Sequence, residues 1–193
     1  MQKKLLKLEL LGMLFVIVMS VFLQNLYEIS GKTLIGVMFG SVNDSIWEIE
    51  KTLLLPYLLW SLIELLCVRV PFRKFIVSKT ISLWCFGIMY SAICLLYSVS
   101  GNESHMFPEF IASIVCTVLA FYLSYRLILS DKELGNYFYP AFFMIMLFTA
   151  FFCSFTPFPP QMPLFMDRTT GLYGIIPENF DIGAVYLDSI FVV

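Results

Sequence analysis

Residues 40–51, GSVNDSIWEIEK, place a run of turn-forming residues directly before an apolar segment that carries two glutamates and a lysine. Ser45 and Glu48 have the spacing of a helix capping box, in which the serine accepts a hydrogen bond from an early backbone N–H and the glutamate reaches back to the cap. The stretch therefore predicts a helix that begins just after Ser45. Its polar groups also make it a candidate site, formed by Asn43, Asp44, Glu48, Glu50 and Lys51.

The composition around this stretch is that of an integral membrane protein. Of the 193 residues, 60% are hydrophobic and 13% are charged, and the mean hydropathy is +0.86, far from the values of soluble globular domains. The formal net charge of −2 supplies no basic surface for phosphate groups, so we expect no nucleic-acid partner. The expected partner is the lipid bilayer, and a homo-oligomer or a second membrane protein are open alternatives.

Five stretches approach the length of about 20 apolar residues that a helix needs to cross the hydrocarbon core. They are residues 5–27, 46–68, 75–98, 108–129 and 137–155. Backbone groups in lipid must be hydrogen-bonded internally, which favours helices. We therefore expect an all-α membrane domain over residues 1–193, built as a bundle of about five transmembrane helices.

The distribution of Lys and Arg predicts the orientation of this bundle. With the N-terminus in the cytoplasm, nine of the twelve basic residues lie on the cytoplasmic side: Lys3, Lys4, Lys7, Arg69, Arg73, Lys74, Lys79, Arg126 and Lys132. Such an excess is typical of cytoplasmic loops and predicts an N-in, C-out protein of the plasma membrane. The same topology places Glu28, Asp44, Glu48 and Glu50 on the outer side, so we expect an acidic outer face.

One side of the second predicted span is polar. Glu50, Tyr57, Ser61 and Glu64 lie within about 60° of one another when successive residues of a helix turn by about 100°. Polar side chains at membrane depth normally face the bundle interior or water. We therefore expect this side of the helix to face inward.

The segment after the fifth predicted span, residues 156–176, is rich in Pro and Gly. Its prolines exclude a helix, whereas Asp167 can accept hydrogen bonds from nearby backbone N–H groups and Gly171 suits a positive φ. Because the segment is also apolar, we expect it to fold back as a plug over the bundle and to bring Asp167 towards Glu48. Residues 177–193 form a tail to which we assign no function.

Two motifs resemble those of a family of small bacterial multi-pass membrane proteins for which no activity is known. The first is SVNDSIWE at residues 41–48, followed by Lys51, Pro56 and Glu64. The second is PPQMPLF at residues 159–165, followed by D, T, G, Y and G at positions 167, 170, 171, 173 and 174. The resemblance implies that this chain shares the fold of the family, and it implies no particular activity.

Three functions remain open on these residues. An acidic outer vestibule formed by Glu28, Asn43, Asp44, Glu48, Glu50, Lys51 and Asp167 could bind a cation or a small amine-bearing solute. Alternatively, Glu48 could be the general base of an intramembrane hydrolase, or of its catalytically degenerate homologue, with Mg²⁺ or Ca²⁺ held by carboxylates. In the third reading the protein is structural or accessory. No hydrolase or phosphate-binding motif occurs, so we expect no enzyme activity and no cofactor, a divalent cation being the one alternative.

Overall fold

The computed structural model describes residues 2–99 and 106–175, and within them the chain is helical apart from turns and one isolated antiparallel bridge between Met166 and Tyr173. The predicted tail, residues 177–193, lies outside the described residues. The elements in chain order are α1 (Gln2–Gln24), α2 (Leu26–Ile29), α3 (Leu34–Phe39), α4 (Ile46–Cys67), α5 (Phe72–Val99), α6 (Met106–Leu129), the 3-10 helix η1 (Leu134–Tyr137) and α7 (Phe138–Ser154).

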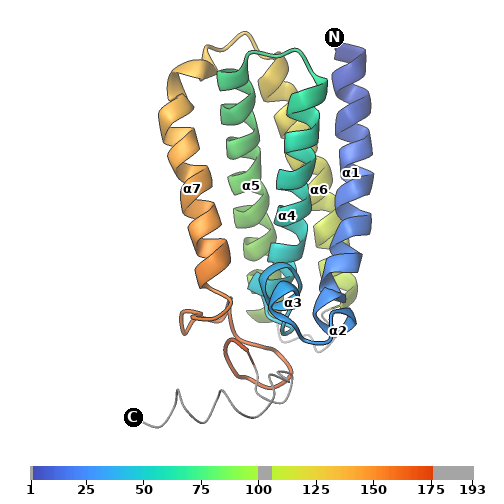
Figure 1. Ribbon diagram of the computed structural model, residues 1–193, viewed down its shortest axis with the longest axis vertical. Helices are drawn as coiled ribbons and strands as arrows, with labels where there is room; N and C mark the ends of the chain where they lie inside the picture. The colour runs from blue at the N-terminus through green and yellow to red at the C-terminus, as the bar shows by residue number, and fades with distance from the viewer. Residues whose placement is uncertain (1, 100–105, 176–193) are drawn as a thin grey trace.

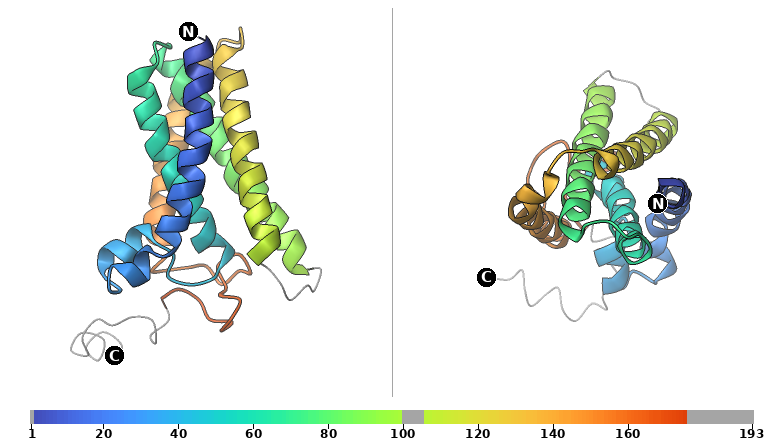
Figure 2. Two further views of the ribbon diagram at one scale, coloured as in Figure 1. Left: turned by 90° about the vertical axis from the view of Figure 1, so that its right-hand side faces the viewer. Right: turned by 90° about the horizontal axis from the view of Figure 1, so that it is seen from above.

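The five long helices run side by side along the long axis of the molecule (Figure 1). Helix α5 packs against α6, α4 and α7, while α1 packs against α4 and α6. The N-terminus lies at one end of this bundle, and the short helices α2 and α3 lie at the other end, together with the segment that follows α7 (Figures 1 and 2). The main apolar core lies between the long helices and includes Leu53, Tyr57, Phe86 and Phe121, all about 1% exposed or less.

Four of the long helices are long and apolar enough to cross a membrane, over residues Gln2–Gln24, Phe72–Ser98, Phe107–Leu129 and Leu134–Ser154. The fifth, α4, is not among them because it carries Glu48, Glu50, Lys51 and Glu64. All four of these charged side chains are buried, at 5% exposure or less. The composition therefore supports four spans, and a crossing by α4 stays a prediction.

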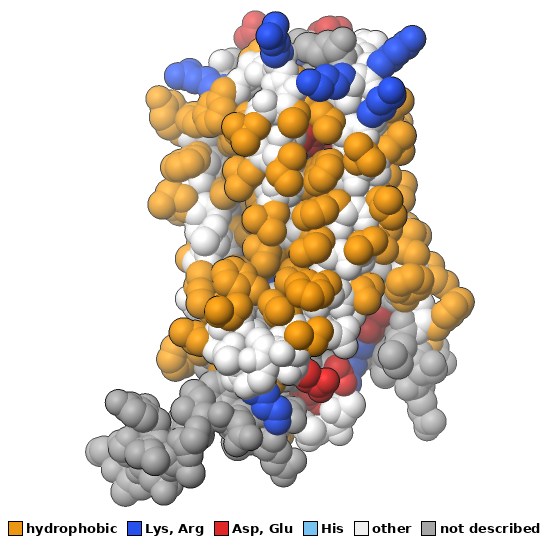
Figure 3. Space-filling view, turned by 45° about the vertical axis from the view of Figure 1, so that its right-hand side comes forward, with side chains coloured by type: hydrophobic (Ala, Val, Ile, Leu, Met, Phe, Trp, Pro, Cys, Tyr) orange, Lys and Arg blue, Asp and Glu red, His pale blue; other side chains and the backbone are white. Residues whose placement is uncertain are grey.

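Apolar side chains cover the sides of the bundle on the face shown in Figure 3, and Lys and Arg gather at the end that holds the N-terminus. Leu14, Leu66, Ile88, Leu96 and Phe143 are among the large hydrophobic residues that are more than half exposed. Exposed apolar surface on this scale is costly in water and suits contact with lipid. Together with the four apolar helices, it indicates a membrane protein.

Helix α4 begins where the capping sequence places it. The backbone N–H of Glu48 donates a hydrogen bond to the hydroxyl of its N-cap Ser45 at 3.3 Å. The reciprocal half of the capping box is absent, because the Glu48 carboxylate accepts from the backbone N–H of Val42 at 3.1 Å instead. The polar side of α4 faces inward as predicted, since Glu50, Tyr57, Ser61 and Glu64 are all buried.

Candidate functional site

A buried network holds together the end of the bundle away from the N-terminus. The Lys51 ammonium lies 2.7 Å from Oε2 of Glu48 and also donates to the Val37 carbonyl at 3.2 Å and the Thr156 hydroxyl at 3.0 Å. Thr156 in turn donates to Oε1 of Glu48 at 2.8 Å. This network joins α3, α4 and the chain after α7, and it satisfies both carboxylate oxygens of Glu48.

The loop before α4 is held by the segment that follows α7. The Asn43 amide donates to the carbonyl of Gly174 at 2.8 Å, and the backbone N–H of Asp44 donates to Oδ2 of Asp167 at 3.1 Å. One turn further on, the backbone N–H of Trp47 donates to the carbonyl of Leu164 at 3.1 Å. The segment 156–175 thus contacts the N-terminal end of α4 through the motifs that the sequence analysis singled out.

A rigid turn places Asp167 at this contact. Its Oδ1 accepts from the backbone N–H groups of Thr169 and Thr170, at 2.7 and 2.8 Å, and from the Thr169 hydroxyl at 2.6 Å. Gly171 closes the turn with φ of +71°, a left-handed conformation that glycine adopts without strain. The turn therefore fixes one carboxylate by backbone geometry, as its sequence predicted.

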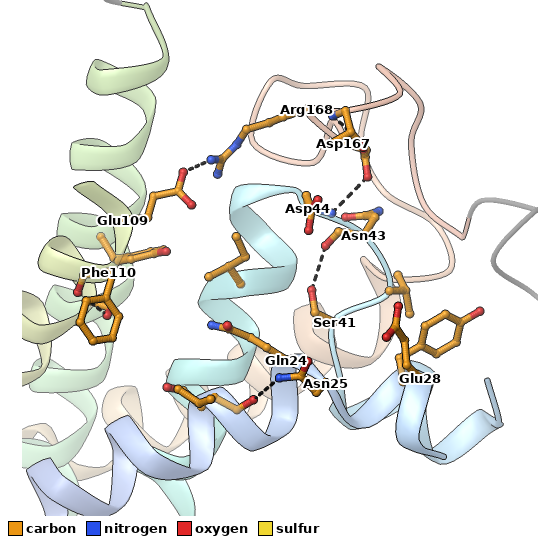
Figure 4. Close-up of a pocket in the computed structure, with 18 of the residues that line it drawn as sticks. Gln24, Asn25, Glu28, Ser41, Asn43, Asp44, Glu109, Phe110, Asp167 and Arg168 are labelled. Atoms are coloured by element: carbon orange, nitrogen blue, oxygen red, sulfur yellow. Dashed lines mark hydrogen bonds and ion pairs between the residues drawn. The ribbon is translucent and has the colours of Figure 1, made fainter. Parts of the chain in front are cut away.

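A cavity of about 990 Å³ opens between α1, α2, the loop before α4, the start of α6 and the turn after Asp167 (Figure 4). Its volume lies at the upper end of the range of small-molecule sites. The wall combines apolar side chains, such as Ile17, Ile49 and Phe110, with many polar or charged ones. The latter include Gln24, Asn25, Glu28, Lys32, Ser41, Asn43, Asp44, Tyr90, Glu109, Ser113, Asp167, Arg168, Thr169 and Thr170.

The four carboxylates of the cavity differ in how far they are already neutralised. Glu109 forms an ion pair with Arg168, which extends from the turn to α6 (Figure 4). The Asp167 carboxylate already accepts hydrogen bonds from the backbone N–H groups of its own turn. The carboxylates of Glu28 and Asp44 have no hydrogen bond or ion pair with any of the residues that the structure describes. These two acids are therefore the ones available to a ligand.

The surroundings of Asp44 and Asp167 shift their pKa values in opposite directions. Burial raises the pKa of Asp44 above its ordinary value, and the nearby Asp167 carboxylate adds to this, while Arg168 partly offsets it. Burial acts to raise the pKa of Asp167 as well, but hydrogen bonds from Thr169, Thr170 and the Asp44 backbone outweigh it and leave the pKa lowered. Asp167 thus stays ionised, whereas Asp44 gains from a cation placed beside it.

The seven candidate residues from the sequence lie in three different places. Glu28, Asn43, Asp44 and Asp167 line the cavity. Glu48 and Lys51 lie in the buried network, beside a second hollow that has no room for a water molecule. Glu50 faces α5 inside the bundle, where it accepts a hydrogen bond from Ser91.

Three charged residues of the cavity, Lys32, Glu109 and Arg168, were not predicted from the sequence as site residues. Glu109 and Arg168 form an ion pair. No local motif links them, because the ion pair depends on how the turn after α7 meets α6. Within residues 2–99 and 106–175, no group of three or more His, Cys, Asp or Glu side chains is arranged to hold a metal ion.

Comparison of the sequence with known proteins identifies a family for this chain. No curated protein and no solved structure matches it. A family model covers residues 1–175, which includes every span, the loop before α4 and the turn that carries Asp167. The chain belongs to this family, which is described as a family of unknown function, DUF6512.

Proposed function

We propose that this protein binds a small solute carrying a cationic amine group, in the cavity at the end of the bundle opposite the N-terminus. The observation that carries the proposal is the pair of cavity carboxylates, Glu28 and Asp44, that form no ion pair or hydrogen bond with any other described side chain. An ammonium group brings the positive charge and the N–H donors that such carboxylates lack.

We place this cavity at the outer face of the plasma membrane, with α4 as a fifth crossing. The positive-inside distribution supports this orientation, since nine of the twelve Lys and Arg residues fall on the N-terminal side of the bundle. Burial of all four charged residues of α4 supports its crossing, because charged side chains in a membrane face the bundle interior and pair there.

The cavity favours an organic amine over a divalent metal ion. Mg²⁺ and Ca²⁺ take six or more oxygen ligands, including several carboxylates or waters. Two of the four cavity carboxylates are already engaged, one by Arg168 and one by backbone N–H groups. An ammonium needs fewer ligands and is held well by two carboxylates and nearby hydroxyl or amide oxygens, such as those of Ser41 and Asn43.

Nothing in the cavity favours the hydrolase hypothesis for Glu48. Its carboxylate is 2% exposed, paired with Lys51 and does not line the cavity. A general base must reach the proton that it abstracts, directly or through one water. Glu48 is better explained as the residue that ties the loop before α4 to Lys51 and Thr156, and so shapes the cavity wall.

Titration calorimetry of the protein in mild detergent tests the proposal, with 1,4-diaminobutane and butylamine as probes and butanol as the uncharged comparison. We expect the amines to bind and butanol not to bind. Loss of one charge-assisted contact costs about 1.5–3 kcal/mol, so Asp44→Asn and Glu28→Gln should each raise the Kd about tenfold or more. The affinity should also rise with pH as Asp44 ionises.

Matched controls keep this test specific. Glu133→Gln and Asp131→Asn remove exposed acids between α6 and α7, at the other end of the bundle, and should leave the Kd unchanged. If the amines and butanol bind equally, or if the control variants weaken binding as much as Asp44→Asn, the proposal is wrong.

A further inference from the structure

A second group of ionisable side chains lies inside the bundle, near the end that holds the N-terminus. It joins Glu9 of α1, Glu64 of α4 and Lys79 of α5, and each is 4% exposed or less. Glu9 and Lys79 belong to helices that are apolar enough to cross a membrane. The proposed solute cavity is lined by none of the three, so this group is a separate feature.

The lysine lies between the two carboxylates. Its ammonium is 3.2 Å from both carboxylate oxygens of Glu9 and 2.5 Å from Oε2 of Glu64. The Ser124 hydroxyl of α6 donates to Oε1 of Glu9 at 2.9 Å, so α1, α4, α5 and α6 each contribute a side chain to the group. The rings of Tyr57, Phe75 and Phe121 surround the ammonium at 5.2 to 5.6 Å from their centroids.

The charges of this group do not balance. Two ionised carboxylates and one ammonium leave one net negative charge, and among the described residues no further basic side chain pairs with either acid. Of the neighbouring groups, Tyr57 is the other titratable side chain that faces Lys79, and α6 contributes the Ser124 hydroxyl and the Phe121 ring, which carry no charge. An unbalanced charge in such a dry interior is costly.

The geometry also limits which species can neutralise the excess negative charge of this group. The ammonium of Lys79 already occupies the position between the carboxylates that a metal ion would take. Neither oxygen of Glu64 has a hydrogen-bond partner of good geometry among the described residues, although both are buried. A proton takes up almost no volume. A carboxyl group that carries it gains an O–H donor, which can form a hydrogen bond with an oxygen of the other carboxylate.

We propose that Glu9, Glu64 and Lys79 form a proton-binding site, in which the two carboxylates share one exchangeable proton beside the lysine ammonium. With the proton bound, the group is neutral. Releasing it leaves one net negative charge buried inside the bundle, which is costly in such an interior. A proton held inside a bundle of apolar helices is a feature of membrane proteins that couple their state to pH.

Infrared spectroscopy of the detergent-purified protein tests this site through the C=O stretch of a protonated carboxyl group. The measurements use a Glu50→Gln background, because Glu50 is a further buried acid that forms no ion pair with any residue in the described part of the chain. We expect the background protein at pH 7 to show one protonated carboxyl per chain. Glu9→Gln and Glu64→Gln should each abolish this band, because either change leaves one carboxylate balanced by Lys79.

Two further variants test whether the infrared band comes from this group. Glu48→Gln removes an acid that already has its own lysine partner and should leave the band unchanged. Lys79→Gln removes the only positive charge of the group and should increase the band to two protonated carboxyls. The proposal is overturned if the background protein lacks the band, if the band survives in Glu9→Gln or Glu64→Gln, or if it does not increase in Lys79→Gln.

Discussion

Two aspartates that lie side by side in the cavity wall have different roles, and the difference arises from their hydrogen bonds. Asp167 accepts from three backbone N–H groups and a hydroxyl, which hold its pKa below the ordinary value. Among the residues that the structure describes, none donates to the Asp44 side chain, and burial raises the pKa of this carboxyl. The Asp167 carboxylate therefore stabilises the cavity wall, and the Asp44 carboxylate is available to a ligand.

At this scale we predict that Asp167→Asn destabilises the protein by about 1–3 kcal/mol at pH 7. The amide oxygen can replace one accepting oxygen and accepts less strongly, whereas the amide NH2 cannot accept at all, although both carboxylate oxygens accept in the wild type. The pKa of Asp167 is lowered in the folded protein. Its stabilising effect is therefore complete above the pKa of an unfolded aspartate and is lost as the pH falls through the folded value.

Thermal unfolding in detergent between pH 7 and pH 3 measures this effect. The difference in Tm between the wild type and Asp167→Asn should shrink as the pH falls. Asp131→Asn, which changes an exposed aspartate, should not alter Tm at any pH. A difference that stays constant with pH would show that the charge of Asp167 is not what stabilises the turn.

The sequence predicts individual residues well where the interaction is local. The Ser45 cap, the Asp167 turn and the positive φ of Gly171 all follow from neighbouring residues, because their partners lie within four positions. The pairing of Arg168 with Glu109 and of Lys79 with Glu9 could not be predicted, since each joins elements far apart in the chain.

At the scale of elements, the sequence predicted all five long helices with ends that differ from the observed ones by no more than three residues. Long apolar segments fix such helices almost independently of their neighbours. The short helices α2 and α3 were not predicted, because helices of this length have little stability of their own and depend on packing. Tyr27 and Val37, one from each, pack together with Val42.

Close approach of α1 to its neighbours depends on Gly12. A Cβ atom added there would lie 2.4 Å from Cε1 of Phe121 and 2.4 Å from the indole nitrogen of Trp60, which donates to the Leu8 carbonyl at 3.0 Å. We predict that Gly12→Ala forces α1 away from α4 and α6 and costs about 1–3 kcal/mol, as overpacking of an interior does.

Thermal unfolding of Gly12→Ala beside Gly135→Ala tests this packing. An added Cβ at Gly135 meets only Cβ of Arg73, at an ordinary contact distance of 3.6 Å. The first variant should lower Tm clearly and the second should change it little. Equal effects of the two substitutions would mean that the helix contact at Gly12 is looser than the structure has it.

At the scale of the whole molecule, α4 connects two polar regions through an apolar bundle. Its first turn carries the network that shapes the cavity, and its last turns carry Glu64 of the proton-binding group. The sequence predicted one polar side of this helix, but could not tell which partner each group would meet. That depended on how α1, α5 and the segment after α7 pack around it.

We propose above that α4 crosses the membrane although it is charged, and that this crossing places the cavity on the outer side. Labelling of single cysteines at its two ends tests this claim directly, after Cys67, Cys85, Cys94, Cys116 and Cys153 are replaced by Ala. Thr33→Cys lies before α4 and Pro71→Cys after it, and both positions are exposed and leave every Lys and Arg in place.

A membrane-impermeant maleimide is applied to intact cells and to permeabilised cells. We expect Thr33→Cys to be labelled in intact cells and Pro71→Cys to be labelled only after permeabilisation. Labelling of both positions under the same condition would place the two ends of α4 on one side of the membrane and would exclude a crossing by this helix.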